Sequence, residues 1–150
     1  MNAPPNEIEP SRSRALQIVL VENDPALLVL FADWLRELGH DVRETADPTE
    51  ALAWLAQRRD VDVLFTDINI PAMDGRELGA RARQFFPGLR IVFATGYSAR
   101  KLPDLRSDPL VRYLRKPFGP DEVAKALDAL QHAAGVPPLK SDGATDGPSA

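Results

Sequence analysis

Four residues able to take part in phosphoryl chemistry follow short apolar runs in this 150-residue chain. The acids Glu22 and Asp67 each come directly after such a run, and Thr95 and Lys116 follow two later runs. A carboxylate can attack phosphorus and form an acyl phosphate, while an ammonium group and a hydroxyl can hold the phosphoryl oxygens. These residue types predict phosphoryl transfer with Asp67 as the acceptor, provided that the fold brings them together.

The same acids are suited to a divalent cation. Mg²⁺ prefers oxygen ligands in near-octahedral geometry and keeps several waters. Glu22 and Asp67 supply carboxylate oxygens, and the backbone carbonyl of Asn69 can supply another. Lys116 can pair with Asp67 at rest and with phosphoryl oxygens after transfer. No Gly-rich phosphate loop or dinucleotide fingerprint is present, so nucleotide-binding folds of those kinds are not supported.

Short apolar runs alternate with helical patterns along the chain. The runs predict five strands, at residues 16–21, 40–45, 61–66, 89–94 and 111–114. Strands that alternate with helices form a parallel sheet covered by helices on both faces. We therefore expect a flavodoxin-like, doubly wound (βα)5 fold of the α/β class, with strand order 2-1-3-4-5. Ligands of such sheets bind at the carboxyl ends of the strands, where the residues named above lie.

Capping signals mark where the helices begin. Asp24 and Asp47 each precede a proline, which is typical of an N-cap followed by the first helical residue. Glu50 is expected to complete a capping box with Asp47. Two further helices are expected to begin at Gly75 and Gly119. Segment 97–110 contains two prolines and few apolar residues, so its helix, the fourth, is predicted to be short or irregular.

Composition narrows the class of protein. The ends, residues 1–14 and 135–150, are rich in Pro, Gly, Ser and charge and are predicted to be disordered tails around a domain at 15–134. The net charge of −4 argues against binding to nucleic acid. Cysteine is absent, and the chain has neither a secretory signal nor an apolar run that could span a bilayer. We expect a cytoplasmic protein that does not bind membranes.

Four stretches together resemble the receiver domain of response regulators, the phosphoacceptor module of bacterial two-component signalling. They are IVLVENDP (18–25), VDVLFTDINIPAMDG (61–75), IVFATGYS (91–98) and VRYLRKPFGPDE (111–122). The strongest signal is TDINIPAMDG with KPF at the right distance downstream, and the similarity is to single-domain, chemotaxis-regulator-like receivers. It covers roughly 120 residues.

The resemblance implies a role for each site residue. Asp67 is the phosphoacceptor, Lys116 the lysine that faces it, Thr95 the switch hydroxyl and Tyr113 the switch aromatic. Two more positions, at Asn69 and Tyr97, tune hydrolysis of the acyl phosphate in the family. The peptide bond before Pro117 is expected to be cis, as it often is in receivers.

The chain departs from the family pattern at the acidic pair. Receivers usually have two adjacent acids after the first strand, the second a direct Mg²⁺ ligand, whereas this chain has Glu22 and Asn23. The expected Mg²⁺ ligands are thus Glu22, Asn23, Asp67 and the backbone carbonyl of Asn69. An amide oxygen brings no charge, so we expect weaker Mg²⁺ binding than in a two-acid receiver.

The resemblance also implies partners. A histidine kinase or phosphotransfer protein would donate the phosphoryl group, and an unknown downstream protein would bind the modified form. The domain is expected to be a monomer or weak homodimer, and not an enzyme beyond self-phosphorylation from small donors and autodephosphorylation. Three alternatives stay open: a phosphorylation-independent interaction domain, a receiver fragment of a hybrid histidine kinase, and a small phosphatase. Asn69 argues against the phosphatase, because it stands where such enzymes need an acid.

Overall fold

A parallel five-stranded sheet forms the centre of the protein in a computed structural model, which describes residues 15–58, 60–96 and 108–132. The strands are β1 (Gln17–Val21), β2 (Asp41–Thr45), β3 (Val63–Asp67), β4 (Arg90–Thr95) and β5 (Val111–Arg115). The helices are α2 (Pro25–Glu37), α3 (Pro48–Gln57), α4 (Gly75–Phe85) and α5 (Pro120–Gln131). The strand order is β2-β1-β3-β4-β5, which confirms the predicted flavodoxin-like topology.

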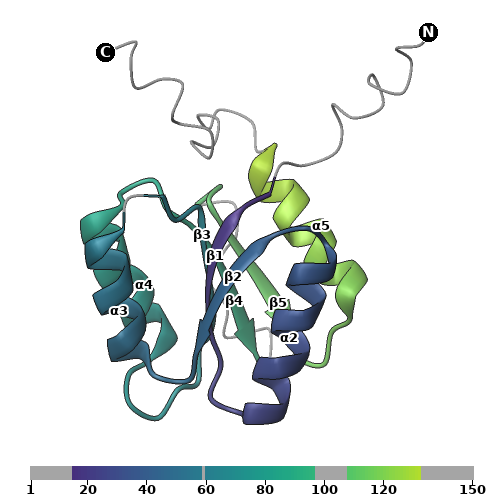
Figure 1. Cartoon of the computed structure of the whole chain (residues 1–150), viewed down its shortest axis with the longest axis horizontal. Helices are drawn as coiled ribbons and strands as arrows, with labels where there is room; N and C mark the ends of the chain where they lie inside the picture. The colour runs from purple at the N-terminus through teal and green to yellow at the C-terminus, as the bar shows by residue number, and fades with distance from the viewer. Residues whose placement is uncertain (1–14, 59, 97–107, 133–150) are drawn as a thin grey trace, which may run out of the picture.

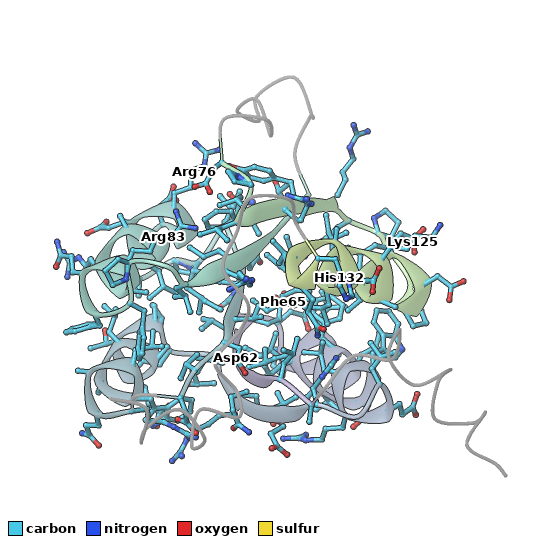
Figure 2. All side chains as sticks on the ribbon, turned by 90° about the horizontal axis from the view of Figure 1, so that it is seen from above. Asp62, Phe65, Arg76, Arg83, Lys125 and His132 are labelled. Carbon is cyan, nitrogen blue, oxygen red and sulfur yellow. The ribbon has the colours of Figure 1, made fainter. Side chains whose placement is uncertain are left out.

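Helices cover both faces of the sheet, with α2 and α5 on one side and α3 and α4 on the other (Figure 1). The strands β3 and β4 are buried along their whole length, as expected for central strands of a parallel sheet. Their side chains alternate between two apolar cores: Phe65 belongs to the core under α2 and α5, and Leu64 to the core under α3 and α4. These side chains fill the space between the sheet and its helices (Figure 2).

The helices begin much as the capping signals indicate. The Asp24 carboxylate accepts hydrogen bonds from the N–H groups of Ala26 and Leu27, and Asp47 accepts one from Thr49. Both residues are therefore N-caps, as predicted.

The expected capping box at Glu50 is wrong. The Thr45 hydroxyl at the end of β2 accepts the N–H of Asp47 at 3.0 Å, which is the donor that the box would have used. The same hydroxyl donates to the Glu50 carboxylate. A strand-end threonine therefore takes the place of the glutamate at this N-cap. In α5 it is Glu122 that accepts the N–H of the N-cap residue, Gly119, at 2.9 Å.

The register of the sheet brings the carboxyl ends of β1, β3, β4 and β5 to one edge. Val21 pairs with Thr66, so the next residues along the chain, Glu22 and Asp67, lie level with each other. Thr95 pairs with Arg115, which places Lys116 just beyond the end of β4. The strands β3 and β4 each end one residue later than the apolar runs that predicted them. The expected tails and most of the predicted fourth helix fall outside the described residues. None of the described helices is long and apolar enough to cross a membrane.

At the amino ends of the strands, His40 is a buried, hydrogen-bonded histidine. Its Nδ1 accepts the N–H of Leu16 at 3.0 Å, and the residue is 8% exposed. Burial lowers the pKa of His40, and the charge of Asp41 opposes this effect only in part. Protonation would both charge a buried ring and remove the acceptor of Leu16.

The stability of the domain is therefore predicted to depend on the protonation of His40. A folded-state pKa below the unfolded value means that this contribution is complete above about pH 6.5 and is lost as the pH falls from there to the folded pKa. Urea midpoints measured across this range should fall in the native chain and in His132→Gln, since His132 is exposed. They should fall less in His40→Gln. Equal slopes in the two variants would contradict the assignment.

Candidate functional site

Two buried carboxylates and one ammonium group meet at the carboxyl edge of the sheet. Glu22, just after β1, is 2% exposed, and Asp67, the last residue of β3, is 6% exposed. The Nζ of Lys116 lies 3.1 Å from Oε1 of Glu22 and 3.1 Å from Oδ2 of Asp67. We call Glu22, Asp67 and Lys116 the carboxylate–lysine cluster. The topology thus brings together three residues that the sequence analysis singled out separately.

Backbone donors hold the remaining two oxygens of these carboxylates. Oε2 of Glu22 accepts the N–H of Asp24 at 3.0 Å, and Oδ1 of Asp67 accepts the N–H of Asn69 at 3.1 Å. Each carboxylate oxygen therefore has one N–H donor. Buried charge is tolerated only when it is paired and hydrogen-bonded in this way. Both carboxylates are fixed by their own loops, and the lysine side chain reaches in to bridge them.

The electrostatics of Lys116 follow from this position. Burial on its own lowers the pKa of Lys116, but the hydrogen bond and charge of Asp67 together with those of Glu22 outweigh it, so the pKa lies above its ordinary value. The lysine is therefore a permanent cation at neutral pH. Two carboxylates and one ammonium leave the cluster with one net negative charge.

The predicted switch residues lie beside the cluster on β4 and β5. Thr95 is buried at the end of β4, and its carbonyl accepts the N–H of Lys116 at 2.7 Å. Tyr113 is half-buried on β5, where its ring stacks on Phe93 with centroids 5.3 Å apart. Burial raises the pKa of the Tyr113 phenol, an effect that the charge of Arg76 opposes. The Lys116–Pro117 bond is cis, as the resemblance predicted, and Tyr97 lies outside the described residues.

The oxygen-bearing groups at this edge of the sheet fit Mg²⁺. They carry less negative charge than a site with three acids would. Asn23 and Asn69 are exposed next to the two carboxylates. Among residues 15–58, 60–96 and 108–132, no three His, Cys, Asp or Glu side chains gather to hold a metal. Position 23 carries an amide rather than a third acid. Proteins commonly bind Mg²⁺ through one or two carboxylates, with waters completing the octahedron. Two carboxylates, an amide and a backbone carbonyl meet that requirement.

The family pattern of the response regulator receiver domain matches residues 18–128. The chain belongs to this family. Receiver domains generally serve signalling rather than act as catalytic enzymes, and they interact with histidine kinases or phosphotransfer proteins and with downstream targets.

Curated relatives include both short and long proteins. The response regulator receiver protein CpdR of Brucella abortus is 32% identical over 119 residues, which are 79% of this chain and 98% of CpdR. The response regulator protein FleR of Pseudomonas aeruginosa is 33% identical over 133 residues, and the match covers 86% of this chain but 27% of FleR. The sensor kinase CckA of Brucella abortus is 31% identical, over 79% of this chain and 13% of CckA. The chain thus spans nearly all of CpdR and a minor part of the other two.

Solved structures agree with the fold of a receiver. The receiver domain of the hybrid histidine kinase CckA aligns with a TM-score of 0.65 at 29% identity, covering 77% of this chain and 99% of that one. A response regulator receiver protein from Sinorhizobium medicae aligns with a TM-score of 0.69 at 27% identity, covering 78% and 94%.

Gly75 is a site-forming residue of this receiver that the sequence analysis treated only as the start of a helix. A Cβ at this position would lie 2.2 Å from the carbonyl oxygen of Asp67 and 2.7 Å from the Cα of Ile68. The N–H of Gly75 also donates to the Ile68 carbonyl at 2.8 Å. The start of α4 therefore rests directly on the backbone of the predicted phosphoacceptor. Its sequence signal is the last letter of the motif TDINIPAMDG.

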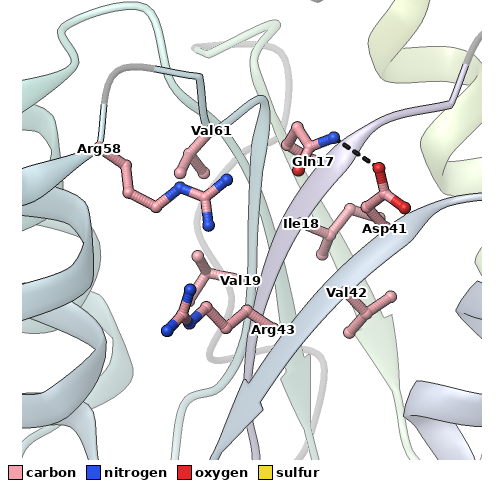
Figure 3. A pocket seen from close by; sticks show the side chains of 8 residues that line it. All are labelled: Gln17, Ile18, Val19, Asp41, Val42, Arg43, Arg58 and Val61. Atoms are coloured by element: carbon pink, nitrogen blue, oxygen red, sulfur yellow. Dashed lines mark hydrogen bonds between the residues drawn. The ribbon is translucent and has the colours of Figure 1, made fainter.

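A cavity of about 230 Å³ lies away from the cluster, at the amino ends of β1 and β2 (Figure 3). Its two arginines already have partners: Arg58 pairs with Asp60 at 3.0 Å, and Arg43 lies 4.6 Å from the centre of a ring of Trp54. The cavity is lined by Gln17, Ile18, Val19, Asp41, Val42, Arg43, Arg58 and Val61. It takes no residue from the carboxylate–lysine cluster.

The contact at Gly75 predicts that Gly75→Ala is disruptive. The added methyl group collides with backbone rather than with a movable side chain, so the free energy of unfolding should fall by about 1–3 kcal/mol. Amide NMR signals around Asp67 should shift at the same time. Gly88→Ala is the control, since nothing lies within 4 Å of a Cβ at that exposed glycine. A Gly75→Ala variant as stable as the native chain would disprove the close approach.

Proposed function

We propose that this receiver accepts a phosphoryl group on Asp67 from a histidine kinase or a phosphotransfer protein and then switches a protein-binding surface. The main support is the contact of Lys116 with both Asp67 and Glu22 at 3.1 Å. In this contact the ammonium group of Lys116 balances the charge of the Asp67 carboxylate at the sheet edge. The same ammonium group can also hold phosphoryl oxygens. That arrangement is what transfer of a phosphoryl group to a carboxylate requires.

In the proposed reaction, a carboxylate oxygen of Asp67 attacks the phosphorus of a phosphohistidine. The O–P bond forms, the P–N bond breaks, and the leaving imidazole takes up a proton. Lys116 keeps its place and exchanges its hydrogen bond with the Asp67 carboxylate for one with a phosphoryl oxygen. The Asp24 N–H and Lys116 hold Glu22 throughout, so the site does not have to rearrange its anions during transfer.

Mg²⁺ is the cofactor that we propose for this step. Glu22, Asn23, Asp67 and the backbone carbonyl of Asn69 would hold it, and when bound it supplies positive charge against the phosphoryl oxygens. Asn23 contributes an uncharged oxygen. The electrostatic attraction for the cation then comes from two carboxylates, opposed by the ammonium of Lys116.

The switch would begin at Thr95. Its hydroxyl is proposed to hydrogen-bond a phosphoryl oxygen, and the ring of Tyr113 then turns inward, which shifts the population of the surface formed by β4, β5 and α5. Thr95 already holds the backbone of Lys116, so movement at one residue reaches the other. Asn69 and Tyr97 are proposed to set the lifetime of the acyl phosphate.

The wider setting is also part of the proposal: a cytoplasmic receiver domain at 15–134, monomeric or weakly dimeric, that binds neither nucleic acid nor membrane. One observation favours a second candidate. Because Asn23 lowers the charge of the cation site, the domain could instead bind its partner without phosphorylation. A receiver fragment of a hybrid kinase is a further alternative, consistent with the match to part of CckA.

Intact-mass analysis after incubation with acetyl phosphate tests the primary proposal. We expect the native chain to gain one phosphoryl group in the presence of Mg²⁺, and to lose the gain when EDTA removes the metal. Asp67→Ala should gain none, whereas Asp33→Ala should behave like the native chain, because Asp33 is exposed within α2. An adduct that persists in Asp67→Ala would refute the assigned acceptor. If neither acetyl phosphate nor a phosphorylated phosphotransfer protein labels the chain, the phosphorylation-independent alternative replaces the proposal.

Restoring the second acid should strengthen binding of Mg²⁺. Asn23→Asp adds a negative charge beside the two carboxylates, and we expect roughly tenfold tighter binding, equivalent to about 1.4 kcal/mol. A Mg²⁺ titration followed by NMR measures this effect. Gln84→Glu adds the same charge on the exposed face of α4 and should leave the affinity unchanged. Equal affinities for the native chain and Asn23→Asp would show that position 23 is not a ligand.

A further inference from the structure

We propose that Phe118 is a positioning residue for Lys116, held in place by three other aromatic rings. This inference rests on the proposed function, because it concerns how Lys116 reaches Asp67. We call Phe31, Trp34, Phe65 and Phe118 the aromatic cluster. They come from α2, from β3 and from the connection between β5 and α5.

Phe118 contacts every other ring of the aromatic cluster. It stacks on Phe31 with centroids 4.9 Å apart and planes at 25°, and it lies 6.3 Å from both Trp34 and Phe65. Phe31 in turn lies 5.5 Å from Trp34 and 6.1 Å from Phe65. Phe31 and Phe65 are buried at 4% and 1% exposure. The rings therefore form one packed unit with Phe118 at its outer side.

The elements that carry the aromatic cluster also lead directly to the groups of the carboxylate–lysine cluster. Phe65 stands two residues before Asp67 on β3, and Phe118 stands two residues after Lys116. Phe31 belongs to α2, which begins three residues after Glu22. Packing among the rings thus fixes the distances between the three segments that supply the cluster.

Lys116 needs such support more than its two partners do. The carboxylates of Glu22 and Asp67 are short, and a local N–H holds each of them. The lysine side chain has to span the distance from its backbone to two fixed carboxylates, so its Nζ reaches both acids only if the backbone lies within range of both. Hydrogen bonds weaken steeply beyond about 3.2 Å, so a displacement of about 1 Å would lose one of the two contacts.

The backbone of Lys116 has two attachments to the rest of the domain. On one side its N–H donates to the Thr95 carbonyl at 2.7 Å. On the other side Pro117 is exposed and Gly119 has no side chain, so it is Phe118 that packs this connection against the core. Removal of the Phe118 ring takes away the side-chain packing of this connection, and its backbone is then held by contacts such as the Lys116–Thr95 hydrogen bond and the hydrogen bond of the Gly119 N–H to Glu122.

Kinetics of phosphorylation by acetyl phosphate test the proposal at a temperature where every variant is folded. Phe118→Leu keeps an apolar side chain but loses the stacked ring, and we expect it to slow phosphorylation about tenfold. Phe118→Tyr keeps the ring and should restore nearly the native rate. Leu130→Ala is the matched control, because it removes a fully buried side chain from the same core. It should lower stability while leaving the rate nearly unchanged.

A double-mutant cycle separates positioning from a general loss of stability. In a Lys116→Met background Phe118 has no lysine to position, so Phe118→Leu should cause no further slowing. An equal slowing in both backgrounds, or an equal slowing by Leu130→Ala, would overturn the proposal.

The side-chain NMR signals of Lys116 give a readout that does not depend on phosphorylation. In Phe118→Leu the Cε signal should move toward that of an exposed lysine, and in Leu130→Ala it should not. If the native chain cannot be phosphorylated, the proposed function fails and this signal still decides the positioning role. An unchanged Cε signal in Phe118→Leu would overturn it.

Discussion

The burial of two carboxylates at one sheet edge is the constraint on which the site depends. Glu22 and Asp67 are almost fully buried, and an unpaired charge in such a place costs several kcal/mol. The cation that compensates them comes from the far end of the chain, 49 residues after Asp67. Only a sheet in which β1, β3, β4 and β5 run parallel brings Glu22, Asp67 and Lys116 to the same edge. Fold and site are therefore a single requirement: the topology brings the charges together, and Lys116 makes their proximity tolerable.

The contacts around this edge also explain how a local event can reach a distant surface. Lys116 is bound by its side chain to both acids and by its backbone to Thr95, while Tyr113 precedes it on β5 and packs on Phe93 of β4. A change in the charge on Asp67 alters what Lys116 and Thr95 can bind. The hydrogen bond between Lys116 and Thr95 joins the end of β5 to the end of β4. The switch that we propose for the surface near β4 and β5 would use this connection.

The sequence predicted what depends on period, capping and motif, and missed what depends on tertiary contacts. The strand order was predicted from the alternation of strands and helices and from the order that five-stranded parallel sheets commonly adopt. The role of Asp24 as an N-cap was predicted from the Asp-Pro sequence at the start of α2. The capping box at Glu50 was wrong because Thr45, a residue of the preceding strand, already satisfied the N–H of Asp47. The motif TDINIPAMDG ends at Gly75, but the close approach of Gly75 to Asp67 depends on how α4 meets β3 and became apparent only in the structure. The packing of Phe118 against three rings was equally out of reach, since Phe118 lies far from those rings in the sequence.

Asn23 is best understood through the charge balance of the cluster. Two carboxylates and one ammonium leave one net negative charge, and every carboxylate oxygen has an N–H donor. A third carboxylate at position 23 would attract a divalent cation more strongly, but it would also add repulsion whenever the cation is absent. In the proposed Mg²⁺ site, an amide at position 23 would lower both the attraction for a divalent cation and the repulsion among the carboxylates. Lys116 is the cation that contacts both acids directly, at 3.1 Å from each.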